Sequence, residues 1–214
     1  MSVAVKICGL STDETVTAAI AGRAAYAGFV FYRPSPRAVT PQRAAQLCAL
    51  IPEGVARVGL FVDADDRLID EALEAAPLDI LQFHGSETPE RVAEAKLRFG
   101  RPVMKAVAVA GSQDVLGAAR YEDVADLLLF DARPPRRPEA LPGGNGLVFD
   151  WQLIANRPWR QPWMLSGGLT AELLPEAVRI SGATAVDVSS GVESGPGIKD
   201  RAKIRAFLAA ARSL

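Results

Sequence analysis

Two short stretches place chemically active side chains where a β-like run ends. The stretch "VKICGLS" at residues 5–11 carries Cys8 directly before a glycine, and "LLLFDARPP" at residues 127–135 carries Asp131 directly after an apolar run. A thiolate can accept a proton and a protonated carboxyl group can donate one, so these residue types suit a general base and a general acid. The alternatives are a buried core thiol for Cys8 and a helix cap or solvated loop carboxylate for Asp131.

Alternation along the first run adds a charge beside the thiol. Ala4, Lys6 and Cys8 share one face of a strand, so an inward Cys8 places Lys6 inward as well, one layer below it. We expect the Lys6 ammonium to lower the pKa of Cys8 from its usual value of about 8.5. The second cysteine, Cys48, lies in an Ala/Leu-rich helical stretch and is expected to pack in the core. Two cysteines are too few for a disulfide framework, which indicates a reducing, cytoplasmic setting.

Short apolar β-like runs recur along the whole chain, and alanine-rich stretches with helical spacing separate most of them. The runs cover residues 3–8, 27–31, 57–62, 79–83, 103–107, 127–131, 163–166 and 185–189. Helical stretches between them include residues 41–50 and 89–99. Capping residues mark three helix starts, at residues 11–14, 40–41 and 86–89.

This alternation of strands and helices is typical of an α/β fold with a parallel sheet. Eight runs in 214 residues recur about every 27 residues, which suits a single (β/α)8 TIM barrel formed by residues 1–214. A doubly wound open sheet is the alternative, because periodicity does not show whether a sheet closes. Neither G-x-G-x-x-G nor G-x-x-x-x-G-K-[ST] occurs, which counts against a dinucleotide-binding or nucleotide-binding fold.

A barrel of this kind would do its chemistry at the carboxyl ends of its strands. The residues that end each run, or follow it directly, are Cys8, Phe31, Val62, His84, Val107, Asp131, Ser166 and Ser189. These positions are therefore the candidates for a pocket at the barrel mouth.

Three further polar residues belong to this predicted mouth. His84 is the only histidine and has no cluster of metal-binding residues near it, so we expect it to line the pocket and expect no metal site. Arg37 follows the second run and can hold a carboxylate through two parallel hydrogen bonds; the alternative is a solvated loop arginine. Asp187 shares a face with Ser189, so it is expected to bind a sugar hydroxyl or to belong to the barrel's polar layer.

Glycine-rich turns follow the last two runs. "LSGGL" at residues 165–169 and "VSSGVE" at residues 188–193 stand where barrels commonly bind phosphate through backbone N–H groups, and "PGGNG" at residues 142–146 can contribute as well. The candidate phosphate ligands are Gly143, Gly144, Gly167, Gly168, Ser190 and Gly191. We therefore expect a phosphorylated small-molecule ligand.

The overall composition limits the classes of partner. The formal net charge is −1, from 24 basic and 25 acidic residues, and gives no electrostatic reason to expect nucleic acid or an anionic membrane as partner. No run approaches the ~20 apolar residues that cross a bilayer, and the first residues enter a strand pattern directly instead of a signal peptide. Nothing in the sequence separates a monomer from a dimer.

The residues described so far belong to longer stretches that occur in a characteristic order. These stretches are "VKICGLS", "AGFVFYRPSPRAVTP", "RVGLFVD", "LQFHGSETP", "LLFDARPP", "GGNGLVFDW", "LSGGL" and "AVDVSSGVESGPGIKD". With them the chain resembles the phosphoribosylanthranilate isomerases of tryptophan biosynthesis, nearly from end to end. The resemblance departs at Ser11 and Asn145, where the family usually has threonine; both substitutes keep their hydrogen-bonding ability.

The resemblance implies a (β/α)8 barrel that carries out an Amadori rearrangement of N-(5-phosphoribosyl)anthranilate. It implies that Cys8 is the general base, that Asp131 is the general acid and that Arg37 binds the anthranilate carboxylate. From their positions on and after their strands, we expect Lys6 and His84 to belong to the same substrate site. The glycines and Ser190 named above would bind the phosphate. A protonated Asp131 would open the ribose ring and a Cys8 thiolate would take the proton from sugar C2, so no redox group, metal or other cofactor is called for.

Two other functions stay open at this point. One is the isomerase of histidine biosynthesis that performs the same type of rearrangement, but that enzyme is expected to use aspartates at both catalytic positions, and Cys8 argues against it. The other is a non-catalytic domain that binds a phosphorylated ligand. Such a domain would need neither Cys8 nor Asp131 for proton transfer.

Overall fold

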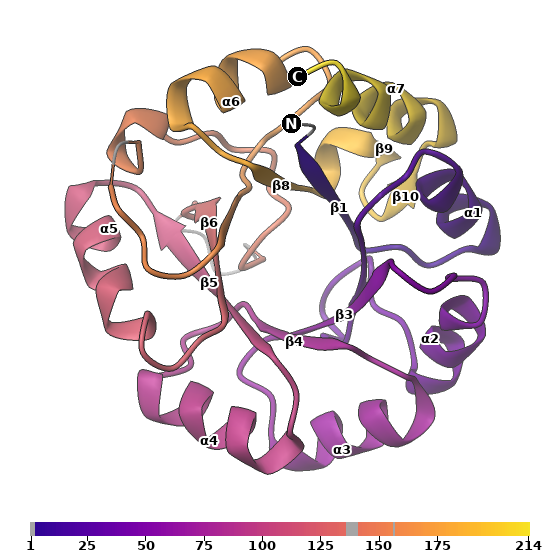
Figure 1. The fold of residues 1–214 in the computed structure, drawn as a ribbon. Helices are drawn as coiled ribbons and strands as arrows, with labels where there is room; N and C mark the ends of the chain where they lie inside the picture. The colour runs from indigo at the N-terminus through magenta and orange to yellow at the C-terminus, as the bar shows by residue number, and fades with distance from the viewer. Residues whose placement is uncertain (1–2, 136–140, 156) are drawn as a thin grey trace.

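The strands of the protein form one closed sheet. The computed structural model describes residues 3–135, 141–155 and 157–214. Eight parallel strands pair in chain order and β1 pairs with β8, which closes the barrel (Figure 1). The strands are β1 Ala4–Cys8, β2 Tyr26–Val30, β3 Ala56–Phe61, β4 Ile80–Phe83, β5 Val103–Val109, β6 Leu127–Ala132, β7 Trp163–Leu165 and β8 Ala185–Val188. The predicted barrel is confirmed, the open-sheet alternative is wrong, and each predicted run matches its strand to within two residues.

Helices surround the barrel and cover the outer face of the sheet (Figure 1). They are α1 Asp13–Ala21, α2 Pro41–Cys48, α3 Asp66–Ala75, α4 Pro89–Phe99, α5 Ser112–Ala118, α6 Leu174–Ser181 and α7 Arg201–Arg212. Between β6 and β7, the described residues contain the 3-10 turn η2 Trp151–Leu153 in place of an α-helix. In the described ranges no helix has the length and apolar character needed to cross a membrane.

The predicted helix starts are confirmed, each with a threonine as N-cap. The hydroxyl groups of Thr12, Thr40 and Thr88 each accept a hydrogen bond from the backbone N–H three residues further on. Pro41 and Pro89 then occupy the first helical position, where the missing N–H costs nothing. Local sequence therefore determines where these helices begin.

Side chains alternate between the barrel interior and the layer under the helices. Below the mouth, the interior is filled by Val58, Ile80, Met104, Ala106, Leu129 and Met164. The outward-facing side chains, including Phe29, Phe61, Phe83 and Phe130, pack in the larger cluster with the helices, and Cys48 is buried there as predicted. Because both faces of the strands are covered, the strand sequences are almost continuously apolar, and polar residues are concentrated at the mouth.

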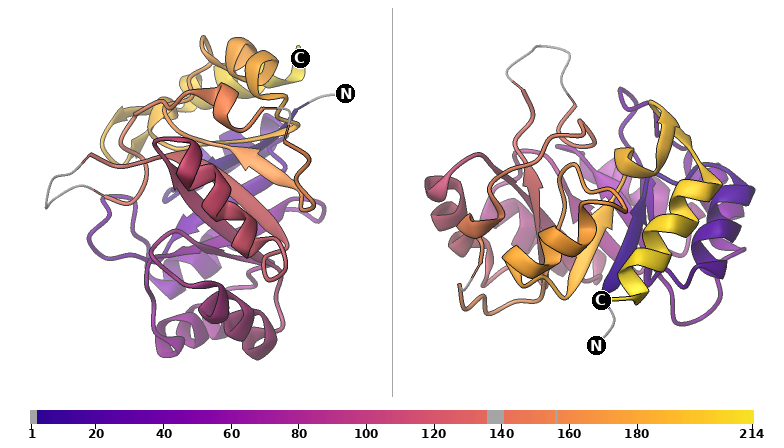
Figure 2. Two further views of the ribbon diagram at one scale, coloured as in Figure 1. Left: turned by 90° about the vertical axis from the view of Figure 1, so that its left-hand side faces the viewer. Right: turned by 90° about the horizontal axis from the view of Figure 1, so that it is seen from above.

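A small hairpin follows the barrel. The turn η3 Ser190–Val192 leads from β8 into the antiparallel strands β9 Glu193–Gly195 and β10 Ile198–Lys199, at the mouth end of the barrel (Figure 2). Gly197 in this hairpin has a φ of 78°, and a Cβ there would lie 2.5 Å from the carbonyl oxygen of Pro36. The hairpin thus packs directly against the loop that follows β2.

The ring of helices closes where α7 packs against α1. Phe207 on α7 is fully buried, so Phe207→Ala should lower the free energy of unfolding by roughly 3–5 kcal/mol through lost burial and a new cavity. Urea unfolding followed by circular dichroism measures the change. Leu97→Ala is the control, because Leu97 is 85% exposed and should change stability by less than about 0.5 kcal/mol. Equal losses in the two variants would contradict this account of the core.

Candidate functional site

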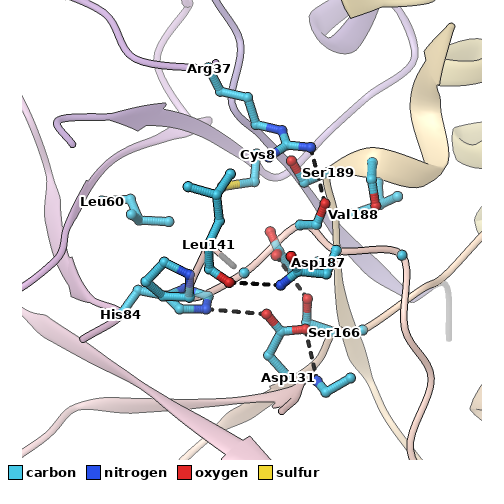
Figure 3. A pocket seen from close by; sticks show the side chains of 18 of the residues that line it. Cys8, Arg37, Leu60, His84, Asp131, Leu141, Ser166, Asp187, Val188 and Ser189 are labelled. Carbon is cyan, nitrogen blue, oxygen red and sulfur yellow. Dashed lines mark hydrogen bonds and ion pairs between the residues drawn. The ribbon is translucent and has the colours of Figure 1, made fainter. Parts of the chain in front are cut away.

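A pocket opens at the carboxyl ends of the barrel strands, where the predicted site residues meet. Its lining includes Cys8, Arg37, His84, Asp131 and Asp187 together with all six candidate phosphate ligands. Cys8 comes from β1 and Asp131 from β6, and Figure 3 shows them on different sides of the cavity with Leu141 drawn between them. Lys6 is not part of the lining, because it lies deeper in the barrel interior.

A buried ion pair lies beneath Cys8. The Lys6 Nζ donates to Asp187 Oδ1 at 2.8 Å, and the Ser166 hydroxyl donates to Asp187 Oδ2 at 3.1 Å (Figure 3 draws the Ser166 contact). Burial alone would lower the pKa of Lys6, but the charges of Asp187 and Cys8 raise it, so Lys6 stays a cation. Both carboxylate oxygens of Asp187 therefore have partners in the barrel's polar layer, which is one of the two roles expected for this residue.

The ionisation of Cys8 corrects a prediction made from the sequence. Burial raises the pKa of the Cys8 thiol, and the nearby Lys6 charge only partly opposes that effect. The expected proximity of Lys6 is confirmed, but the expected net lowering of the Cys8 pKa is wrong. The reason is that a thiolate in the barrel interior loses its hydration, and one ammonium already paired with Asp187 does not replace it. Cys8 is a neutral thiol at neutral pH.

A second chain of polar groups holds Asp131. The His84 Nε2 lies 3.1 Å from Asp131 Oδ2, and Asp131 Oδ1 accepts from the backbone N–H of Ala132 at 2.9 Å (Figure 3). On the other side of the ring, Gln82 Nε2 lies 3.0 Å from His84 Nδ1. The carboxyl group is buried at the end of a strand, so the helix-cap and solvated-loop alternatives do not describe it. Sequence reasoning missed Gln82, although its position two residues before His84 puts it on the same strand face.

Arg37 is held in place before it meets any ligand. Its Nε and Nη2 donate to the two carboxylate oxygens of Glu193 at 2.7 and 2.9 Å, and Nη2 also donates to the Gly144 carbonyl at 3.2 Å. Arg37 is only 5% exposed, so the alternative of a solvated loop arginine is wrong. Glu193 does not take up the guanidinium edge that carries Nη1, and this edge lies against Gly144, where a Cβ would stand 2.6 Å from Nη1.

Lys199 completes this cluster on the hairpin. Its Nζ donates to Glu193 Oε1 at 2.7 Å and to the carbonyl oxygen of Ser189 at 2.8 Å. Burial raises the pKa of Glu193, but the Arg37 hydrogen bond and the Lys199 charge outweigh it and hold that pKa below its usual value. Glu193 and Lys199 were not predicted from the sequence. Both residues lie in short polar stretches of the hairpin, and nothing in those stretches indicates a contact with a residue as distant in sequence as Arg37.

The glycine loops leave no room for side chains between them. Gly167 and Gly168 have φ values of 91° and 60°, in the left-handed region that favours glycine. A Cβ on Gly191 would clash with the carbonyl oxygen of Leu169, so the loops after β7 and β8 are in direct contact. Gly143 approaches the acid from above, since a Cβ there would lie 2.9 Å from Asp131 Oδ2. Backbone groups of these loops thus border the pocket closely.

The remaining predicted residues fall around the rim. Asn145 Nδ2 donates to the Leu141 carbonyl oxygen at 2.8 Å within the loop that covers the mouth. Arg133 forms an ion pair with Asp114, outside the pocket lining. Arg136 and Arg137 of the same loop lie outside the described residues. Within the described ranges, no group of three or more His, Cys, Asp or Glu side chains is placed to hold a metal ion.

An apolar wall completes the pocket. Val30, Tyr32, Leu60 and Val62, from β2, β3 and the residues that follow them, form a cluster with Cys8 at the mouth. The pocket therefore combines three parts, which are an apolar wall, a polar group of Arg37, Cys8 and Asp131, and the glycine loops. A ligand with an aromatic carboxylate at one end and a phosphate at the other would match all three parts.

Comparison with known proteins agrees with this geometry. Residues 5–210 match the family model described as N-(5'-phosphoribosyl)anthranilate (PRA) isomerase. The chain is 56% identical over 214 residues to the N-(5'-phosphoribosyl)anthranilate isomerase of Rhodospirillum centenum, covering 100% of both chains. It is 57% identical over 213 residues to that of Parvibaculum lavamentivorans, covering 99% of each.

Solved structures show the same similarity. The phosphoribosyl anthranilate isomerase from Thermotoga maritima is similar with a TM-score of 0.88 at 36% identity, over 99% of this chain and 100% of that one. A phosphoribosyl anthranilate isomerase in complex with reduced 1-(o-carboxyphenylamino)-1-deoxyribulose 5-phosphate is similar with a TM-score of 0.83 at 34% identity, again over 99% and 100%.

The raised pKa of Cys8 can be tested directly by alkylation. In a Cys48→Ala variant Cys8 is the only thiol, and we expect iodoacetamide to react slowly near pH 7 and ever faster up to about pH 9.5, because only the thiolate is nucleophilic. Mass spectrometry of timed samples gives the rate at each pH. The same variant unfolded in urea is the control, and its rate should level off earlier, around an ordinary pKa of about 8.5. A folded protein that reacts fast near pH 7 and levels off first would contradict the raised pKa.

Proposed function

The chain belongs to the N-(5'-phosphoribosyl)anthranilate isomerase family of tryptophan biosynthesis, and we propose that its barrel mouth performs this isomerisation with Asp131 as general acid and Cys8 as general base. The product is 1-(2-carboxyphenylamino)-1-deoxyribulose 5-phosphate. The observation that carries the proposal is the arrangement of Cys8 and Asp131 in one pocket, between Arg37 and the glycine loops. In this arrangement the sugar would lie between the two groups that would transfer its protons.

The two ends of the substrate have separate binding regions. The anthranilate ring would pack on the apolar wall of Val30, Leu60 and Val62, with its carboxylate on the Nη1 edge of Arg37. The phosphate would bind the backbone N–H groups around Gly167, Gly168, Ser190 and Gly191, supported by Gly143 and Gly144. A guanidinium fork matches a carboxylate, and glycine-rich backbone suits phosphate oxygens, so the orientation follows from the chemistry of each end.

Ring opening would use Asp131. The protonated carboxyl group gives its proton to the ribose ring oxygen, the bond between that oxygen and C1 breaks, and the anthranilate nitrogen lone pair forms a protonated Schiff base with C1. The His84 contact and the Ala132 N–H hold the carboxyl group in a fixed orientation, so the proton is delivered along one direction. Asp131 is left as a carboxylate.

Removal of the C2 proton would use Cys8. The neutral thiol of Cys8 first gives its proton to solvent, and the thiolate formed in this way takes the proton from C2. The electrons of that C–H bond form the C1=C2 double bond as the iminium is neutralised. The resulting enolamine becomes the ketone when its C2 hydroxyl loses a proton and C1 gains one. Lys6, beneath the thiol, would stabilise the thiolate while it exists, which gives the buried cation a part in this step.

The type of reaction also determines what we expect for cofactors, for the ligand and for the remaining polar residues of the site. The rearrangement is redox-neutral and consists of proton transfers, so no cofactor is expected. The ligand would be a free phosphorylated sugar derivative in the cytoplasm, not a nucleic acid or a membrane lipid. His84 and Asp187 would contribute by ordering Asp131 and Lys6, and a contact of Asp187 with a sugar hydroxyl remains a prediction.

Turnover in two point variants tests the acid–base pair. We expect Cys8→Ala and Asp131→Asn each to lower kcat by about 10²–10⁴-fold, the usual contribution of a positioned acid or base. The substrate is generated in place from anthranilate and phosphoribosyl pyrophosphate, and its fluorescence is followed. Binding of the reduced product analogue should change less than about threefold, because neither residue supplies the main binding contacts.

Other outcomes of this experiment separate the competing accounts. An inactive wild type would remove the isomerase proposal. Parallel losses of binding and turnover in both variants would favour a non-catalytic phosphate-ligand domain. Activity in Cys8→Ala would show that Cys8 has only a packing role, and a different residue would then have to act as the base.

Arg37→Lys tests the carboxylate contact. Lysine keeps the charge but cannot bind Glu193 and a substrate carboxylate at the same time, so KM should rise roughly tenfold, about 1.4 kcal/mol, with kcat little changed. Arg33→Lys is the control, because Arg33 is exposed on the same loop. The corresponding phosphoribosyl derivative of aniline, which lacks the carboxylate, should show almost no difference between wild type and Arg37→Lys. An equal effect on both substrates would contradict the contact.

A further inference from the structure

A buried glutamine stands in the barrel interior where its neighbours are apolar. On β4, Ile80, Gln82 and His84 point inward, and Gln82 is fully buried, in register with Leu60 on β3 and Met104 on β5. Its Nε2 contacts His84, but its Oε1 has no hydrogen-bond partner among the described residues. A buried carbonyl oxygen without a partner is destabilising, so its presence calls for an explanation.

The direction of each hydrogen bond in this set of side chains depends on whether the Asp131 carboxyl group carries a proton, and the form without it is taken first. An Asp131 carboxylate can only accept, so His84 Nε2 must carry the ring proton and donate to Oδ2. In a neutral ring the Nδ1 is then an acceptor, and the group facing it has to be a donor. The Gln82 amide nitrogen supplies that donor at 3.0 Å. Gln82 therefore selects the Nε2–H tautomer of His84 in this state.

We propose that Gln82 is a positioning residue for the general acid: its amide fixes the tautomer and orientation of the His84 ring, which in turn holds Asp131. The proposal rests on the proposed function, since it concerns the acid of that reaction. Gln82 touches neither the pocket nor the reacting atoms, because it is not part of the pocket lining. It acts only through His84.

The unpartnered oxygen becomes useful when Asp131 is protonated. The acid then has an O–H that can donate to His84 Nε2, the ring proton must be on Nδ1, and the group facing Nδ1 has to be an acceptor. Half a turn of the Gln82 side-chain amide puts Oε1 in that place and completes the chain. The two hydrogen-bonding arrangements differ by one proton. Asp131 takes up this proton from solvent before the reaction and gives it to the substrate ring oxygen during the reaction.

An amide serves both states, because it carries a donor and an acceptor. An apolar side chain at this position would leave Nδ1 without a partner in either state, and a carboxylate could only accept from Nδ1–H. Since the acid has to be protonated before ring opening and ionised after it, a residue that pairs with both tautomers keeps the His84 ring in place throughout. This accounts for a glutamine among apolar neighbours and for its spare oxygen.

The single histidine of the chain makes the proposal measurable without turnover. In untagged ¹⁵N-labelled protein, long-range ¹H–¹⁵N spectra report which imidazole nitrogen carries the proton. At neutral pH we expect the Nε2–H tautomer in the wild type, a loss of that preference in Gln82→Met, and a doubly protonated ring in Gln82→Glu. Met104→Leu is the matched control, because it changes packing beside Gln82 without touching the chain of hydrogen bonds, and it should keep the wild-type spectrum.

Kinetics supply the second readout. Gln82→Met should lower kcat about tenfold, part of the 10²–10⁴-fold that general acid catalysis contributes, with KM changed less than about twofold. Met104→Leu should stay within about twofold of wild type in both parameters. If circular dichroism shows that Gln82→Met does not fold, Gln82→Glu is used in its place. In that variant kcat should also fall, and the spectra should show a doubly protonated His84 ring.

Several results would overturn the proposal. These are an Nδ1–H tautomer in the wild type at neutral pH, an unchanged His84 spectrum in Gln82→Met or Gln82→Glu, or a kcat in these variants equal to that of wild type. Equal losses in Gln82→Met and Met104→Leu would assign Gln82 a packing role and would also overturn it. A wild type without isomerase activity would instead refute the proposed function, and the tautomer measurement keeps the two failures distinguishable.

Discussion

The pairing of β1 with β8 is the constraint on which the site depends. In this pairing Lys6 stands opposite Asp187, and their buried ion pair spans the seam between the first and last strands of the barrel. Leaving either charge without the other inside the barrel would be strongly unfavourable, so the pair and the closed register support each other. Closure also brings Cys8, at the end of β1, beside the phosphate-loop candidates that follow β8. The thiol and that binding region are neighbours only because the sheet has no edges.

Two separate polar networks then give the proposed base and the proposed acid different surroundings. Cys8 lies above the cation of the Lys6–Asp187 pair, whereas Asp131 belongs to the chain through His84 to Gln82. No hydrogen bond among the described residues joins the two networks. Pairs of titratable groups with different environments are the usual basis for assigning distinct acid and base roles at one pH.

Local features could be predicted from the sequence, and contacts between distant segments could not. The eight strands and the threonine caps follow from periodicity and from neighbours in the chain, and alternation alone placed Lys6 inward beneath Cys8. The sign of the Cys8 pKa shift was predicted wrongly, because it depends on how completely the assembled barrel buries the thiol. Glu193 was missed for a related reason, since its partner Arg37 lies 156 residues away in sequence.

The hairpin after β8 connects the two ends of the pocket and so determines how a ligand would lie between the acid and the base. Glu193 binds Arg37, the proposed partner of the substrate carboxylate, and Lys199 joins Glu193 to the Ser189 carbonyl, directly before the candidate phosphate ligand Ser190. All three charged side chains are at least nine-tenths buried, so the connection is short and shielded from solvent. A ligand held at both ends by parts of one rigid cluster has little freedom to slide. In the proposed function its central sugar would then be kept between β1 and β6, where the distance between thiol and carboxyl group is set by the barrel itself.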